Sequence, residues 1–211
     1  MERKPWILSR FTNLFDDGRG RRIIEAVFRK NNGVPITYTL IAQSNWSTGL
    51  AMTTDGKIIK VREPKPGRGS ATDNFYGWEL PAAALKTSEG NTPEELFAKA
   101  IENETGYRAG RIVQIGPDEP MLMASRTSPT SVRLFVALDC VKVGEPKEKP
   151  EDEEIEVELV SMVEWVNECL LHPTVNDWSA VCATVFGLIH LGWTIQPPVP
   201  QMGDGPVDPR D

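Results

Sequence analysis

The chain has 211 residues, of which 25% are charged and 40% are hydrophobic, and its formal net charge is -7 at pH 7. This acidic balance disfavours binding to nucleic acids, whose phosphate backbone attracts clustered basic residues. No apolar run approaches the roughly 18 residues of a membrane-spanning helix, so we expect no membrane segment. The length fits one substantial core with an arm and a tail.

The cysteines Cys140, Cys169 and Cys182 are odd in number and too far apart for a CxxC motif. They predict free thiols in a reducing compartment rather than a disulfide framework or a zinc site. The N-terminal sequence "MERKPWILSRF" has basic residues but lacks the apolar core and cleavage site of an export signal. We therefore expect a cytoplasmic protein.

The first predicted elements are strands. From Arg21 to Thr54, β-branched and aromatic residues alternate with others, and the pattern is broken at "NNG" and "NWSTG". This pattern predicts strands linked by hairpins. A turn at Asp55-Gly56 then separates two strand-like runs, and "FYGWELPA" follows a segment rich in Gly, Pro and Lys.

A helix is predicted from about Pro93 to about Thr105. Thr92 fits the N-cap, and Glu95 lies three residues later, which completes a capping box. Pro93 suits the first helical position, and Gly106 suits a left-handed stop. Apolar residues recur at helical spacing and predict one face packed on a sheet: Leu96, Phe97, Ala100 and Ile101.

Further strands are predicted in "RIVQIG", "EPMLMAS", "VRLFVALDCVKV" and "IEVELV", with the acidic loop "GEPKEKPEDEE" before the last of them. Ser161 and Glu164 form a second capping box, which opens a helix that ends before Pro173. A third helix should run from about Asp177 to Leu191. The last stretch, "QPPVPQMGDGPVDPRD", has too little apolar content to order itself and is expected to be a tail.

The order of a strand with "WELPA", a loop, a capped helix ending in "E-x-G-aromatic" and further strands resembles the Nudix hydrolase family. Within the family it is similar to the branch that cleaves ADP-ribose and related nucleoside diphosphate compounds. The resemblance spans roughly Ile23 to Gly192 and implies an α/β fold, an α/β/α sandwich around a mixed β-sheet. We expect a β-strand arm at 1–50, the Nudix-like domain at 51–195 and the tail at 196–211.

The resemblance also implies Mg²⁺ or Mn²⁺, held against a pyrophosphate by helix glutamates. The family pattern is Gly, five residues, Glu, seven residues, then Arg-Glu-apolar-x-Glu-Glu-x-Gly-apolar. Four positions of this chain match the end of that pattern: Ile101, Glu104, Gly106 and Tyr107. Other positions depart from it: Ala83 for the first Gly, Lys99 for the Arg, Ala100 for the next Glu, and Asn103 for the middle Glu. The preceding loop is two residues longer, which leaves Glu89 or Asn91 at the loop Glu position.

Glu104 is therefore the remaining helix carboxylate for a metal ion, with the Asn103 amide and the Ala82 carbonyl as weaker ligands. Glu102 cannot join Glu104, because two residues rotate the helix by roughly 200°. Since Mg²⁺ is usually held by carboxylates together with substrate phosphates, we expect weak binding that needs the substrate.

Other candidate residues follow from the same resemblance. Glu153 and Glu154 are candidates for the general base, with Glu154 preferred and Glu156 also possible; the alternative is a solvated acidic loop. Arg62 and Lys65 match basic positions near substrate phosphates, or else they form a solvated edge. Trp78 either lines a nucleobase pocket or is part of the packed core.

The predicted function is hydrolysis of a nucleoside diphosphate linked to another moiety, of the ADP-ribose or nucleotide-sugar type. The replaced glutamates predict that this activity is weak or lost. The alternative is an inactive module that binds a nucleotide or a protein partner on the same fold, and a different chemistry on that fold is a third possibility. The resemblance also implies a homodimer in which the arm of one subunit helps to cover the pocket of the other.

Overall fold

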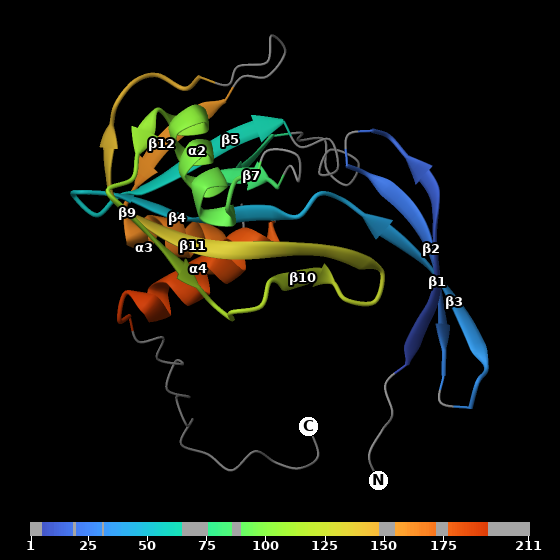
Figure 1. The fold of residues 1–211 in the computed structure, drawn as a ribbon. Helices are drawn as coiled ribbons and strands as arrows, with labels where there is room; N and C mark the ends of the chain where they lie inside the picture. Colours follow the sequence, from blue (N-terminus) through green and yellow to red (C-terminus); the bar gives the residue numbers. More distant parts are fainter. Residues whose placement is uncertain are drawn as a thin grey trace, which may run out of the picture.

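The computed structural model describes residues 6–18, 20–30, 32–64, 76–85, 90–147, 155–171 and 177–193. Within these ranges the chain forms a small antiparallel sheet and a large mixed sheet. Figure 1 shows the small sheet as an arm beside the body, with α2 on one side of the large sheet and α3 and α4 on the other. The predicted α/β class, with a mixed main sheet and an N-terminal β arm, is confirmed.

The arm contains β1 (Ile7–Asp16), β2 (Arg22–Arg29) and β3 (Pro35–Ala42), in the order β1-β2-β3. The last two confirm the predicted hairpin, whereas β1 lies outside the segment predicted to form strands. Every residue of β1 is exposed. The next strand, β4, begins at Trp46 and belongs to the large sheet, so the sheet of the arm ends at Ala42.

The large sheet has nine strands, and its central path runs in the order β10-β11-β4-β5-β12. β4 and β11 are parallel, and the other pairs are antiparallel. The strands are β4 (Trp46–Thr53), β5 (Ile58–Pro64), β6 (Tyr76–Glu79), β7 (Ala82–Ala84), β8 (Tyr107–Arg108), β9 (Arg111–Ile115), β10 (Met121–Ala124), β11 (Ser128–Lys142) and β12 (Glu156–Val160).

The β4 and β11 backbones approach each other closely at Gly49. A Cβ atom added there would lie 2.0 Å from the carbonyl oxygen of Phe135. Gly is therefore required at this point of the parallel pair, since any side chain would push the two central strands apart.

Two hydrophobic clusters cover the two faces of the large sheet. On one face Phe97 and Ile101 of α2 pack against Ile59 and Phe135, and the rings of Phe97 and Phe135 stack with their centroids 5.5 Å apart. On the other face Trp165 is completely buried among residues of β4, β11 and α4. Its indole N–H donates to the Thr184 hydroxyl at 2.8 Å, which satisfies the buried polar atom.

Helix α2 (Pro93–Thr105) has the predicted ends. The Thr92 hydroxyl accepts from the Glu95 N–H, and the Glu95 carboxylate accepts from the Thr92 N–H. Gly106 closes the helix with φ of 72°. A Cβ atom at Gly106 would lie 2.1 Å from the carbonyl oxygen of Gly144, so the stop needs Gly for conformation and for space.

The C-terminal helices also follow their local signals. Ser161 and Glu164 form the predicted capping box of α3 (Met162–Val166), which continues as the π-helical turn η1 (Asn167–Leu171). Asp177 caps α4 (Trp178–His190) by accepting from the N–H groups of Ser179 and Ala180. No helix in the described ranges is long and apolar enough to cross a membrane. The predicted tail at 196–211 lies outside the described residues.

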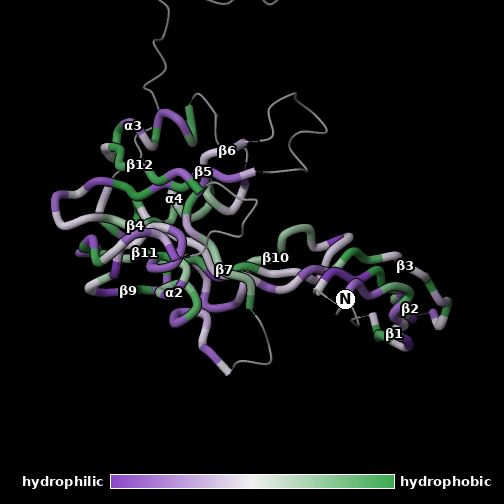
Figure 2. Tube along the Cα trace, turned by 90° about the horizontal axis from the view of Figure 1, so that it is seen from above, coloured by the Kyte–Doolittle hydropathy of each residue, from purple (hydrophilic) through white to green (hydrophobic). Residues whose placement is uncertain are grey.

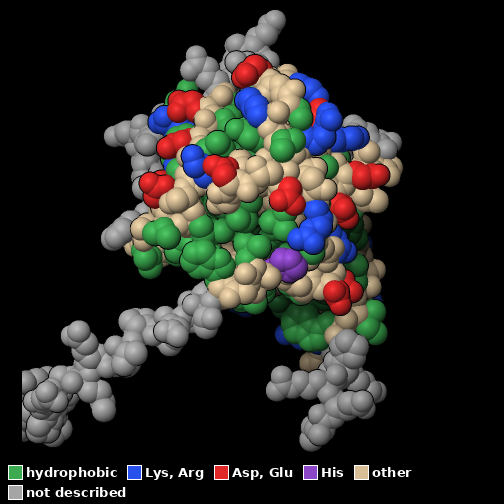
Figure 3. Space-filling view, turned by 90° about the vertical axis from the view of Figure 1, so that its left-hand side faces the viewer, with side chains coloured by type: hydrophobic (Ala, Val, Ile, Leu, Met, Phe, Trp, Pro, Cys, Tyr) green, Lys and Arg blue, Asp and Glu red, His purple; other side chains and the backbone are tan. Residues whose placement is uncertain are grey.

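The arm joins the body through hydrogen bonds to the end of the large sheet. The Ile41 N–H donates to the Thr127 carbonyl at 2.8 Å, and the Gln43 N–H donates to the Thr130 hydroxyl at 2.7 Å. Figure 2 shows β10 extending from the body toward the arm along this connection. The surface of the body in Figure 3 carries interspersed acidic and basic side chains, with hydrophobic side chains gathered on its lower part.

We predict that Gly106→Ala lowers the free energy of unfolding by about 2–4 kcal/mol, because it combines left-handed strain with a clash against backbone. Gly192→Ala is the matched control, since Gly192 also follows a helix with φ of 79° but has no atom within 4 Å of an added Cβ. It should cost about 1–2 kcal/mol. Urea unfolding of both variants measures the difference, and equal losses would contradict the proposed clash.

Candidate active site

A cavity of about 570 Å³ opens between β7 and the N-terminal end of α4. Carboxylates from different parts of the chain line it: Glu63 of β5, Glu79 of β6, Glu104 of α2, and Asp177, the N-cap of α4. Arg21, next to β2, is the one Lys or Arg among the described residues of the lining. The described part of the lining therefore contains four carboxylates and one guanidinium.

Glu104 lies where the end of α2 meets β7. The Ala82 N–H donates to the Glu104 carboxylate at 3.2 Å, and both residues line the cavity. β7 is held on the sheet by its pairing with β4, and the Thr48 hydroxyl donates to the Pro81 carbonyl at 3.0 Å. The structure thus brings together two of the three predicted metal-binding residues.

The neighbours of Glu104 on α2 lie elsewhere. Ala100 is 5% exposed and belongs to the buried side of the helix. The Asn103 carbonyl accepts from the Lys147 N–H at 2.7 Å, and Asn103 is not part of the described cavity lining. Glu102 points away from Glu104, as predicted, and its carboxylate accepts from Arg108 at 3.0 Å and from Lys147. These hydrogen bonds lower the pKa of Glu102 to about 2.

The described residues do not by themselves complete a Mg²⁺ site. No group of three or more His, Cys, Asp or Glu side chains in the described ranges is arranged to hold a metal ion. Mg²⁺ requires near-octahedral oxygen coordination, and it commonly takes one or two protein carboxylates together with water and phosphate oxygens. Glu104 can supply one such carboxylate, so the remaining ligands must come from other groups.

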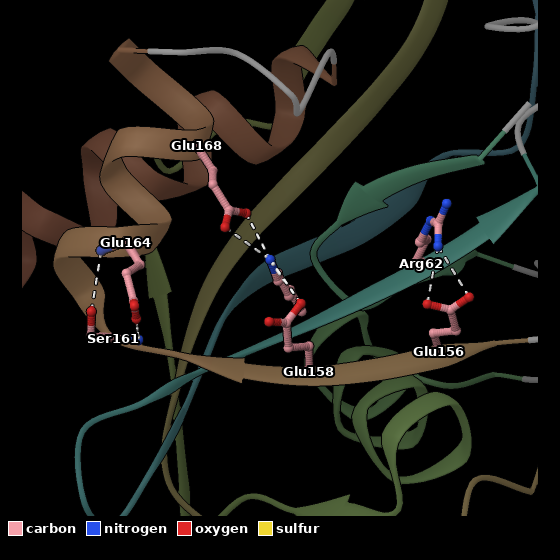
Figure 4. Close-up of polar contacts among 7 residues, drawn as sticks. Arg62, Glu156, Glu158, Ser161, Glu164 and Glu168 are labelled. Carbon is pink, nitrogen blue, oxygen red and sulfur yellow. Dashed lines mark hydrogen bonds and ion pairs between the residues drawn. The ribbon is translucent and has the colours of Figure 1, made fainter. Parts of the chain in front are cut away.

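Arg62 and Trp78, two predicted substrate-binding residues, lie on the sheet beside each other rather than in the described cavity lining. Arg62 donates to both carboxylate oxygens of Glu156 at 3.2 Å, and its guanidinium lies 5.1 Å from the ring centre of Tyr76. Figure 4 shows Arg62 and Glu156 facing each other across neighbouring strands. The guanidinium and the indole thus have partners within the protein.

The same part of the sheet buries a lysine. Lys60 is 2% exposed, and its amino group lies 3.1 Å from Glu158 and 2.7 Å from Glu168. Figure 4 shows these two carboxylates approaching from β12 and from η1. The amino group also lies 4.3 Å from the ring centre of Trp78, so a cation–π contact fixes the indole. The buried charge is therefore balanced, as burial requires.

The remaining predicted residues, Glu153, Glu154 and Lys65, lie outside the described residues, as does Glu89. The described residues stop at Lys147, within the predicted acidic loop, and resume at Ile155 before β12. The Lys147 side chain contacts Glu102 of α2.

The cysteines are free, as predicted. Burial raises the pKa of the Cys140 thiol to about 11, and burial also raises the pKa values of Cys169 and Cys182. Thiols with raised pKa values are poor nucleophiles near neutral pH, so these residues do not supply a nucleophile.

Sequence reasoning missed four residues that line the cavity: Arg21, Glu63, Glu79 and Asp177. One signal was available for Glu79. In a strand, neighbouring side chains point to opposite faces, so Trp78 and Glu79 cannot share one environment. Asp177 was recognised only as a helix start, and the roles of Arg21 and Glu63 depend on how distant segments pack.

We predict that Lys60→Ala lowers the free energy of unfolding by about 2–3 kcal/mol, because it leaves two carboxylates without their cation and removes buried packing. Lys57→Ala is the control, since Lys57 lies 3.9 Å from Asp55 and both side chains are more than half exposed. Such an exposed pair is screened by solvent and should contribute little to stability. Chemical denaturation gives both values, and a loss at Lys60 no larger than that at Lys57 would refute the buried pairing.

Comparison with known proteins gives one similar sequence and one similar fold. No protein-family model matches the chain. The chain is 33% identical over 118 residues to the ADP-ribose pyrophosphatase of Bacillus subtilis (strain 168), and this match covers 54% of the chain and 56% of that relative. The match thus spans little more than half the length of the relative.

A solved structure described as an ADP compounds hydrolase superposes with a TM-score of 0.71 and 16% sequence identity, covering 91% of this chain and 97% of that chain. The similarity at this level of identity concerns the fold, and it includes nearly the whole of the known structure. The chain therefore has the Nudix hydrolase fold and is a homologue of an ADP-ribose pyrophosphatase.

Proposed function

We propose that this protein hydrolyses the diphosphate bond of a nucleoside diphosphate linked to another moiety, with ADP-ribose as the first substrate to test. The observation that carries the proposal is the position of Glu104, which meets the Ala82 amide on the wall of a cavity of about 570 Å³. A cavity of this size can hold much of such a ligand. The sequence similarity to an ADP-ribose pyrophosphatase supports the substrate class.

The proposed cofactor is Mg²⁺ or Mn²⁺. Glu104 would supply a carboxylate ligand, with the Ala82 carbonyl and the Asn103 amide as weaker ligands, and substrate phosphate oxygens would complete the coordination. Bound there, the cation would neutralise phosphate charge and lower the pKa of a bound water. Since Ala100 and Asn103 replace two carboxylates of the family pattern, we propose that turnover is slow.

The proposed general base is Glu154 or Glu153. We propose them because the family resemblance places acidic residues before this strand, and both positions shortly precede β12. Arg62, Lys65 and Trp78 remain the proposed substrate-binding residues. For Arg62 this role requires substrate phosphate to compete with Glu156 for the guanidinium of a side chain that is 34% exposed.

The second candidate function is binding without hydrolysis. The observation that favours it is Ala100, which is 5% exposed at the position of a family metal ligand. A buried Ala at this position supplies no carboxylate oxygen to a metal ion. In this case the cavity would bind a nucleotide or a partner and release it unchanged.

We also propose that the protein is a cytoplasmic homodimer, in which the arm of one subunit helps to cover the pocket of the other. β1 is an edge strand of ten residues, and apolar side chains such as Ile7 and Leu14 are 67% and 57% exposed. A long apolar edge of this kind invites pairing with another chain. A second copy of the arm would bury these side chains in both subunits.

We predict that the wild-type protein slowly hydrolyses ADP-ribose with Mg²⁺ or Mn²⁺, and that Glu104→Gln lowers the rate by at least about 100-fold through loss of a metal ligand. Glu102→Gln is the matched control, because it makes the same change on the other side of α2 and should leave the rate unchanged. Product formation over a panel of nucleotide-sugars and dinucleotides measures this. If the folded wild-type protein forms no product from any compound of the panel, the binding function is favoured.

We predict that light scattering gives a mass of twice 23.5 kDa for the wild-type chain. Leu14→Asp should give the monomer, because it places a charge in the proposed apolar interface. Val163→Asp is the control, since Val163 is similarly exposed, at 60%, but lies on α3. A wild-type monomer at every concentration would refute the dimer.

A further inference from the structure

The cavity contains one basic side chain that the proposed function has not used. Arg21 comes directly before β2, so the arm contributes it to a cavity formed mainly by the body of the same chain. Its residue is exposed, and it forms no ion pair with another described residue. Gln43, which follows β3, is a second cavity residue from the segment that joins arm and body.

The backbone of Arg21 is held in place at both of its polar groups. Its N–H donates to the Asp17 carboxylate at 2.9 Å, and its carbonyl accepts from the Asp17 N–H at 3.1 Å. Gly20, with φ of 93°, passes so close to Ser44 that an added Cβ would lie 2.2 Å from the Ser44 hydroxyl oxygen. The hairpin loop is thereby packed against the segment between β3 and β4.

That segment is in turn bound to the body. The Thr130 hydroxyl accepts from the Gln43 N–H at 2.7 Å and donates to the Gln43 carbonyl at 3.2 Å. The Asn45 side chain accepts from the Ser131 N–H at 2.9 Å. The backbone of Arg21 is therefore fixed at the edge of the cavity, and a bound ligand needs to order only the side chain.

The charge of the cavity indicates what this side chain binds. A diphosphate carries negative charge, and Arg21 is the one Lys or Arg among the described residues that line the cavity. A guanidinium presents several N–H donors in a plane that matches two phosphate oxygens, and it stays charged at every physiological pH.

We propose that Arg21 binds the diphosphate of the substrate in the cavity of its own chain. This inference rests on the proposed function. It makes Arg21 a substrate-binding residue supplied in cis, whether or not the arm also covers the pocket of a second subunit.

The first test measures KM for ADP-ribose, and Kd for ADP-ribose and for inorganic pyrophosphate by calorimetry, all with Mg²⁺. Arg21→Gln should raise these constants by about 10- to 100-fold, because a charge-assisted hydrogen bond is lost. Arg21→Lys should recover part of the affinity, since it restores the positive charge but not the planar set of N–H donors that binds two phosphate oxygens. Arg111→Gln is the control for net charge, because Arg111 is an exposed residue of β9 outside the described lining.

The outcomes separate this inference from the proposed function. Wild-type binding or turnover that Arg21→Gln leaves unchanged would refute the role of Arg21 and leave the proposed function standing. Binding without turnover, weakened by Arg21→Gln, would support Arg21 and refute hydrolysis. A wild-type protein that binds neither ADP-ribose nor pyrophosphate would refute both.

The second test distinguishes action in cis from action in trans. The Arg21→Gln chain is mixed with the Glu104→Gln chain under conditions that allow subunits to exchange. If Arg21 acts in cis, every site keeps one defect, and the mixture shows no more activity or ADP-ribose affinity than its separate components. Recovery in the mixture would mean that Arg21 completes the site of the other subunit, which would overturn the assignment in cis.

Discussion

The way in which α2 ends decides where the Glu104 carboxylate lies. Gly106 takes a left-handed conformation, and its carbonyl accepts from the N–H groups of Val143 and Gly144 at 2.9 Å and 3.2 Å. The end of the helix is thus bound to the residues that directly follow β11, and the Glu104 carboxylate, two residues before Gly106, accepts from the Ala82 N–H. This geometry depends on backbone contacts, so it does not require acidic side chains at other positions of the helix.

The parts of the fold that local sequence signals determine could be predicted. The capping boxes of α2 and α3 each join residues three positions apart, and a left-handed stop needs only one Gly in the right place. Helical periodicity was also enough to separate Glu102 from Glu104. The structure confirms that separation, because Glu102 pairs with Arg108 and Lys147 at the surface.

Contacts between distant segments could not be predicted in this way. In the sequence, nothing distinguishes Lys60 from an exposed charged residue of a strand. Its partner Glu168 lies 108 positions further along the chain. Glu168 lies on the π-helical turn η1, so this pairing depends on how that turn packs against the sheet. The same limit applies to the candidate site, since Arg21 and Asp177 become neighbours of one cavity only after the arm and α4 have packed against the sheet.

The proposed metal site and the proposed role of Arg21 are connected, because both would neutralise the charge of a bound diphosphate. If Ala100 and Asn103 replace metal-binding glutamates, the attraction for a divalent cation is weaker and less of the charge of a diphosphate is neutralised by metal. The Arg21 guanidinium, carried on a fixed backbone, would neutralise part of this charge without a metal ion, and the hydrogen bonds between Gln43 and Thr130 would limit the backbone entropy lost on binding. Substrate affinity in this protein should therefore depend on the arm more than it would in a relative with a complete set of helix glutamates.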